Sequence, residues 1–155
     1  MKKYLLLVIL ILITVMPVFS QAEPCFGLGL SLGGGTDAGF QLTIGLQFGV
    51  YLDSPFNFLL EANGGFVFKN DESFKLGFHY HLGGLIELRI VEILTLGAGG
   101  GMGGDILFVN DSYSYPYIRG SVMVLLFGNL KLGLYYDYGF KYGSMFGLRF
   151  FCYDG

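Results

Sequence analysis

Charged side chains are scarce in this sequence. Only 14% of the 155 residues are Asp, Glu, Lys or Arg, which is about half the share of an ordinary soluble domain. A soluble domain with so few charges would expose a large apolar surface to water. The composition therefore excludes an ordinary soluble domain and indicates that the apolar surface is covered by something other than water.

Long apolar runs are also absent, except for one at the N-terminus. That run covers residues 4–15, follows two lysines and precedes the small-residue site Ser20-Gln21-Ala22. It is shorter than the roughly 20 residues that a membrane-spanning helix needs, and the whole pattern is typical of a secretory signal peptide. We therefore predict that residues 1–22 are a cleaved signal peptide, with an uncleaved anchor as the alternative, and that residues 23–155 form one domain.

Basic residues are outnumbered in the predicted mature domain. Removing the two N-terminal lysines leaves seven basic and twelve acidic residues, a formal charge of −5 (7 − 12). Nucleic-acid-binding proteins carry basic patches, so we expect no nucleic-acid partner.

Helical periodicity is lacking after residue 22, whereas alternation of apolar and polar residues is pervasive. Residues 40–52 alternate without a break, beginning Phe40, Gln41, Leu42, Thr43. A period of two indicates an extended strand with one apolar face. The same alternation predicts eight strands, at residues 26–32, 40–52, 58–68, 74–88, 94–108, 118–126, 130–140 and 145–152.

The glycine-rich segment 97–104 (GAGGGMGG) belongs to the fifth of these strands. A nucleotide-binding loop would need a following helix and a phosphate-binding lysine or a ribose-binding acid. Neither follows here, and the alternation continues through the segment. Glycine inside a strand marks a bend or close packing, so we interpret the segment as a tightly packed strand.

Residue number separates the two faces of the predicted strands. The apolar positions are even-numbered in all eight strands, and every basic residue after residue 22 is odd-numbered. In a soluble barrel the apolar face would line the cavity, and in a transmembrane barrel it would face lipid. Eight strands enclose too little space for so many Phe and Leu side chains. Open sheet edges in lipid are costly, so we predict an all-β, eight-stranded, antiparallel, up-and-down transmembrane β-barrel.

The charged face would then line a narrow lumen, where unpaired charges are costly. We predict a polar network that plugs the lumen, with a narrow polar path or gate as the alternative. Its predicted members are Glu61, Lys75, His79, His81, Glu87, Asp105, Arg119, Lys131, Asp137 and Arg149.

The chain resembles the small eight-stranded outer-membrane barrels, the group of OmpX and the OmpA membrane domain. Besides the strand pattern, residues 141–148 match the polar-x-Gly-x-x-hydrophobic-x-hydrophobic insertion signal of the last strand in that group. The predicted signal residues are Lys141, Gly143, Phe146, Leu148 and Phe150. The group usually ends on an aromatic residue, whereas this chain continues to Gly155. The resemblance implies outer-membrane lipid and the barrel assembly machinery as partners, with residues 33–39, 70–73, 109–117 and 142–144 outside and residues 53–56, 89–92 and 127–129 periplasmic.

Candidate chemistry is sparse. His79 and His81 could bind zinc or relay a proton, but no third or fourth ligand can be identified, so we predict no metal, cofactor or catalytic residue. Some barrels that the chain resembles modify lipid A with a histidine on the membrane face, whereas both histidines here are on the lumen face. An enzyme is therefore the least favoured of the functions considered.

Two further features have alternative interpretations. Six tyrosines form a predicted outer aromatic patch, which is either an interfacial belt or a recognition surface for an extracellular ligand: Tyr113, Tyr115, Tyr117, Tyr136, Tyr138 and Tyr142. Cys25 precedes the first strand and Cys152 ends the last, these two strands are neighbours in a closed barrel, and export permits a disulfide. The bond requires Cα atoms within about 7 Å, and one odd and one even residue do not share a face. The sequence therefore does not decide whether the disulfide forms.

We thus expect a monomeric barrel with a structural or surface-interaction role. A narrow pore or a channel for a small hydrophobic ligand is the alternative, and a lipid-modifying enzyme is a second one.

Overall fold

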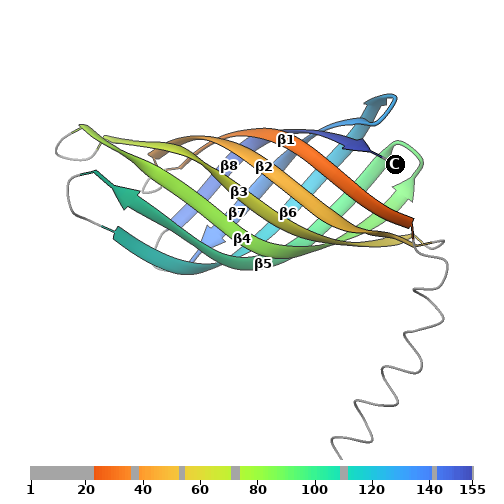
Figure 1. Ribbon diagram of the computed structural model, residues 1–155, viewed down its shortest axis with the longest axis horizontal. Coiled ribbons are helices and arrows are strands. Elements are labelled where there is room, and N and C mark those ends of the chain that lie inside the picture. The colour runs from red at the N-terminus through yellow and green to blue at the C-terminus, as the bar shows by residue number, and fades with distance from the viewer. Residues whose placement is uncertain are drawn as a thin grey trace, which may run out of the picture.

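The chain forms a single closed barrel of eight antiparallel strands in the computed structural model (Figure 1). The structure describes residues 23–35, 39–52, 55–70, 74–108, 112–140 and 143–154, so the predicted signal peptide lies outside the described residues. The strands are β1 (Glu23–Gly35), β2 (Gly39–Tyr51), β3 (Phe56–Asn70), β4 (Phe74–Val91), β5 (Leu94–Leu107), β6 (Ser112–Phe127), β7 (Leu130–Gly139) and β8 (Gly143–Asp154). In the part of the chain just given, no helix is long and apolar enough to cross a membrane.

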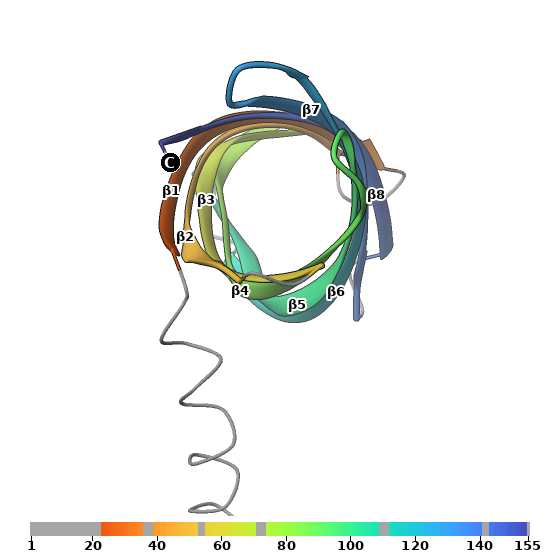
Figure 2. The same ribbon diagram turned by 90° about the vertical axis from the view of Figure 1, so that its right-hand side faces the viewer.

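The strands follow the up-and-down order that the sequence predicts. Each strand pairs with its neighbours in the chain, and β1 closes the barrel by pairing with β8 from Phe26 opposite Asp154 to Gly34 opposite Phe146. We call the end that holds Glu23 and Asp154 the terminal end, and the opposite end the distal end. Figure 2 looks into the terminal end along the barrel.

The register keeps even and odd residues on separate faces around the whole barrel. Paired residues share parity throughout the regular ladders, as in Phe26 opposite Phe48 or His79 opposite Asp105. The register shifts near Val91 in β4 and Phe127 in β6, each beside a tight turn at the terminal end. These shifts place odd-numbered apolar residues outside without disturbing the rest of either strand.

The outer face is apolar from end to end. Large hydrophobic side chains at even positions are exposed on every strand, including Leu60, Leu82 and Leu134 near mid-strand. Aromatic residues gather toward both ends of the outer face. They are Phe40, Phe74, Phe78, Phe108, Tyr136, Tyr138, Phe140 and Phe146 toward the distal end, and Phe26, Phe48, Phe56, Phe58 and Phe127 toward the terminal end. An apolar band between two aromatic girdles is typical of transmembrane barrels.

Glycines on the inner face make room for large inward-pointing side chains. A Cβ atom added to Gly103 would lie 2.2 Å from His81 Cδ2, and one added to Gly83 would lie 2.5 Å from the Tyr117 hydroxyl. These distances are far below van der Waals contact, so only glycine fits there. The glycine-rich segment 97–104 is therefore part of a strand that packs closely against interior side chains, as predicted.

Several strands reach farther toward the distal end than predicted, and the predicted connection 33–39 is wrong for residues 33–35, which belong to β1. β6 begins at Ser112, so residues 112–117 are strand and the predicted connection 109–117 is wrong for that part. Pro116 is tolerated in β6 because the pairing with β7 extends only to Tyr117 opposite Gly139, so the missing N–H lies next to that ladder's end. β8 likewise begins at Gly143, which has a positive φ of 91°.

Candidate functional site

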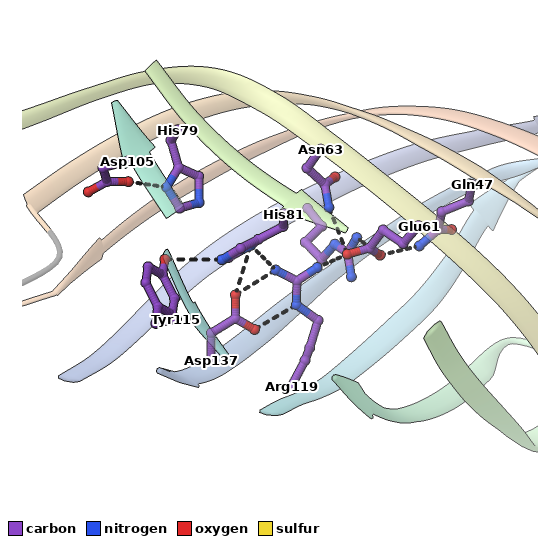
Figure 3. A network of polar contacts seen from close by, with 10 residues as sticks. Gln47, Glu61, Asn63, His79, His81, Asp105, Tyr115, Arg119 and Asp137 are labelled. Atoms are coloured by element: carbon purple, nitrogen blue, oxygen red, sulfur yellow. Dashed lines mark hydrogen bonds and ion pairs between the residues drawn. The ribbon is translucent and has the colours of Figure 1, made fainter. Parts of the chain in front are cut away.

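The centre of the barrel is built around Glu61, which points inward from β3 and is 5% exposed. Its two carboxylate oxygens accept hydrogen bonds from the amides of Gln47 and Asn63, each at 2.7 Å. They also accept hydrogen bonds from the guanidinium groups of Arg119 and Arg149 (Figure 3). One carboxylate is therefore the common partner of four side chains from β2, β3, β6 and β8.

Arg119 extends this network across to β7. Its Nε and Nη2 atoms donate to the two carboxylate oxygens of Asp137 at 2.6 and 2.5 Å, a bidentate pair between residues directly opposite each other. Bidentate guanidinium–carboxylate pairs are among the stronger polar contacts in proteins. Arg119 thus binds two acids at once, Glu61 and Asp137.

His81 adds β4 to the same network. Arg119 Nη2 lies 3.1 Å from His81 Nδ1, and a guanidinium can only donate, so this ring nitrogen is the acceptor. The other nitrogen, Nε2, then carries the hydrogen and lies 3.2 Å from the Tyr115 hydroxyl. The ring also stacks on Tyr117 with centroids 4.2 Å apart, so both its tautomer and its orientation are fixed.

A second cluster surrounds Asp105 toward the distal end. Its carboxylate lies 2.9 Å from Lys69 Nζ, 2.5 Å from His79 Nδ1 and 2.6 Å from the Tyr113 hydroxyl. The other nitrogen of His79, Nε2, is buried and has no hydrogen-bond partner among the described residues. Three donors on one fully buried carboxylate hold β3, β4, β5 and β6 together at this level.

A third cluster lies toward the terminal end. Lys131 Nζ is 3.1 Å from Glu87 and sits over the rings of Tyr153 and Tyr51, at 4.6 and 5.5 Å from their centroids. The Tyr153 hydroxyl donates to Gln47, which connects this cluster to the central one. The three clusters follow one another along the interior from the distal end to the terminal end.

Nine of the ten residues predicted for the lumen network lie in these three clusters. The exception is Lys75, which lies farther out at the start of β4. Lys69 and Tyr113 join the network although neither was among its predicted members. Their odd numbers were the signal that could have placed them inside.

The predicted outer aromatic patch is wrong for half of its members. Tyr115 and Tyr117 point into the barrel and are each 4% exposed, and Tyr113 is half-buried in contact with Asp105. They face inward because β6 already includes them and they are odd-numbered. Tyr136 and Tyr138 are exposed on the outer face of β7, and Tyr142 lies outside the described residues.

The candidate disulfide between Cys25 and Cys152 is not formed. Both cysteines are free, Cys25 being buried and Cys152 exposed. Cys25 points into the barrel beside Leu59 and Leu85, whereas Cys152 lies on the outer face opposite Leu28. Their opposite parity places the two thiols on opposite sides of the wall.

The structure describes four of the five residues of the predicted insertion signal. Of the insertion signal, Phe146, Leu148 and Phe150 are exposed on the outer face of β8 and Gly143 begins that strand, while Lys141 lies outside the described residues. Among the residues that the structure describes, no group of three or more His, Cys, Asp or Glu side chains could hold a metal ion.

Comparisons by sequence identify no relative. No protein-family model matches the chain, and no curated protein matches it.

Comparisons by structure find membrane barrels. Neisserial surface protein A (NspA) is 9% identical, with 85% of this chain and 97% of that chain covered and a TM-score of 0.56. Ail, the attachment invasion locus protein of Yersinia pestis, solved in complex with the heparin analogue sucrose octasulfate, is 14% identical, with 86% and 97% covered and a TM-score of 0.51. A de novo designed transmembrane β-barrel is 14% identical, with 84% and 95% covered and a TM-score of 0.56.

At these identities the likeness concerns the fold alone. The chain has the fold of the small eight-stranded outer-membrane barrels, which confirms the resemblance predicted from its sequence.

Proposed function

We propose that this protein is a monomeric outer-membrane barrel with a plugged polar lumen and a structural or surface-interaction role, and that it is not an enzyme. Its outer face carries apolar side chains on all eight strands, while the buried acids and bases point inward. Every strand pairs with a neighbour on both sides, so the described barrel has no edge strand, which lipid would not tolerate. These features support lipid as the surrounding medium, and the proposal includes assembly by the barrel insertion machinery, as the family resemblance implies.

The contact of Glu61 with Arg119 and Arg149 is the observation that carries the plugged lumen. These three side chains come from β3, β6 and β8, strands that are not adjacent in the barrel, and they meet in its interior. An ion moving along the lumen would have to displace charge-assisted hydrogen bonds at this level. The network therefore supports a barrier to ions.

Single-channel recording of the purified protein in a planar lipid bilayer tests this proposal. We expect no steady conductance above that of the protein-free bilayer. A stable open level in most insertions would contradict the plugged lumen. The recordings should be paired with a gel assay showing that the inserted protein is folded.

Surface exposure of the distal end tests the proposed cellular role. An epitope inserted between residues 109 and 111 would interrupt a connection rather than a strand. We expect antibody to label intact cells that express this variant, and a tag placed at the C-terminus to be labelled only after permeabilisation. The opposite pattern would contradict the proposed orientation.

The acidic distal connections indicate the class of surface partner. They carry Asp37, Asp71, Glu72 and Asp111 in the sequence. Ail was solved with a sulfated saccharide, whereas the acidic sequence of these connections disfavours sulfate groups. We therefore propose a neutral or basic partner for this chain.

A narrow polar path is the second candidate function. Several buried polar atoms have no partner among the described residues, including His79 Nε2, Ser121 Oγ and Arg149 Nε. Water would satisfy such atoms, and a file of water could conduct protons or small ions. Conductance that appears or rises in a Glu61→Gln variant would favour this function over a permanently blocked lumen.

A further inference from the structure

A cavity of about 240 Å³ opens at the terminal end of the barrel. It lies beyond the Lys131–Glu87 pair, at the end of the barrel that faces the viewer in Figure 2. Its wall includes Tyr51, Asn57, Arg89, Lys131 and Tyr153. Except for Lys131 and the two tyrosines, these side chains belong to none of the three clusters in the lumen.

Asn57 presents an unsatisfied acceptor at this cavity. Its side chain is 2% exposed, and its amide oxygen Oδ1 has no hydrogen-bond partner among the described residues. Buried acceptors in folded proteins nearly always receive a hydrogen bond. A bound molecule with an N–H or O–H group would supply that missing donor.

Arg89 presents a cation beside the same wall. Asn57 is paired with Glu87, and Arg89 is two residues further along β4, so the Cα atoms of Asn57 and Arg89 are diagonal neighbours about 7–8 Å apart. The side chain is exposed and forms no ion pair in the part of the chain that the structure describes. The backbone N–H of Arg89 donates to the Pro55 carbonyl at 2.6 Å, which fixes this end of β4.

Two cations at the cavity can receive an anion, and two acids beside them limit the charge of that anion. Arg89 and Lys131 are positive, while Glu92 on the rim and Glu87 behind Lys131 are negative. A guanidinium matches the geometry of a carboxylate, and the two nearby acids disfavour a doubly charged phosphate.

We propose that this cavity binds a carboxylate that carries an N–H group a few bonds away, as at the carboxyl terminus of a peptide. Arg89 and Lys131 receive the carboxylate, and Asn57 Oδ1 accepts the N–H hydrogen bond. The site follows from the barrel alone, and only its location on the periplasmic side rests on the proposed function.

Titration of the nanodisc-reconstituted protein with N-acetyl-alanyl-alanine tests the site, with binding followed by isothermal calorimetry. We expect saturable binding that is weakened at least tenfold when the probe carries a C-terminal amide in place of the carboxylate. Arg89→Gln should weaken binding of the acid by a similar factor. Asn57→Leu should weaken binding of the acetylated dipeptide while leaving binding of acetate unchanged.

Lys75→Gln is the matched control, because it removes one positive charge at the distal end. It should leave binding of the dipeptide unchanged, and each variant should first show the gel mobility of the folded barrel. Absence of saturable binding to the unmodified protein would overturn the proposal. So would equal binding of the amidated probe, tighter binding of inorganic phosphate, or an unchanged affinity in Arg89→Gln, whose exposed side chain is not needed for folding.

Discussion

At the scale of single residues, the interior depends on shared partners rather than isolated pairs. Arg149 is 1% exposed, and its ion-pair partner among the described residues is Glu61. Glu61 also neutralises part of the charge on Arg119. Removing this one carboxylate therefore leaves one buried guanidinium without a counter-charge and a second with only Asp137.

We predict that Glu61→Gln destabilises the barrel by about 3 kcal/mol, because breaking a buried ion pair leaves an uncompensated charge. The isosteric amide keeps the shape of the side chain, removes its charge and replaces one acceptor oxygen with a donor. Urea unfolding of the protein in lipid vesicles measures the change.

The double variant Glu61→Gln/Arg149→Gln provides the control. Removing both charges should cost less than the sum of the two single substitutions. Strict additivity would show that the two side chains are not energetically coupled.

Two glycines form a matched pair for testing the interior packing. A Cβ atom on Gly103 would lie 2.2 Å from His81, which cannot yield easily because Arg119, Tyr115 and Tyr117 hold its ring. A Cβ atom on Gly120, which faces outward in the next strand, would meet nothing within 4 Å. The first position is overpacked by one methyl group and the second is not.

We predict that Gly103→Ala destabilises the barrel by about 1–3 kcal/mol through overpacking. Gly120→Ala should be neutral, or stabilising by about 0.4–1 kcal/mol through a less flexible unfolded chain. Equal effects in urea unfolding would argue against the close packing around His81.

At the scale of strands, alternation determines where each side chain goes. Both register irregularities, near Val91 and Phe127, stand next to a turn, so β4 and β6 keep their faces up to their last residues. A charge at an even position near mid-strand would therefore enter the apolar band. Leu82, 57% exposed in the middle of β4, is such a position, whereas Phe127, 73% exposed, lies at the hairpin between β6 and β7.

We predict that Leu82→Arg destabilises the protein in lipid by about 2–4 kcal/mol and that Phe127→Arg costs about 0–1 kcal/mol. The difference arises because the interface hydrates the guanidinium and the bilayer centre does not. Unfolding from vesicles measures both values, and similar costs at the two positions would contradict the proposed depth of β4 in the membrane.

The strands themselves could be predicted from sequence because each carries the period-two pattern on its own. β6 was the exception at its start, since Ser112, Ser114 and Pro116 hide the alternation of the inward tyrosines. Only the pairing with β5 on one side, opposite Ile106, Gly104 and Met102, shows that these residues are strand.

At the scale of the whole molecule, the side of the wall on which each charge lies was predictable, whereas its partner was not. Residue parity placed Asp105 and Arg119 inside. The partner of each acid depends on how far neighbouring strands are staggered around the barrel, and no local pattern encodes that stagger. Lys69 on β3 reaches past β4 to Asp105 on β5 for this reason, although its place near a strand end indicated a connection.

Closure of the barrel gives a prediction for the intact protein. We expect the folded chain to migrate differently from the boiled chain on a detergent gel, because a closed ladder resists unfolding in detergent. Reductant should not alter the migration of the unboiled form, since Cys25 and Cys152 lie on opposite sides of the wall. A reductant-dependent shift would contradict the structure at the β1–β8 junction.

The uniform parity of paired residues also limits how such a chain can change during evolution. Substitutions that preserve the size and polarity of a side chain leave the wall intact, which allows the amino-acid sequence to diverge widely. Deleting one codon inside a strand would instead turn every following side chain of that strand to the opposite face, exchanging arginine for phenylalanine against the acyl chains. Length variation among descendants should therefore be confined to the connections, and strand lengths should be inherited almost unchanged.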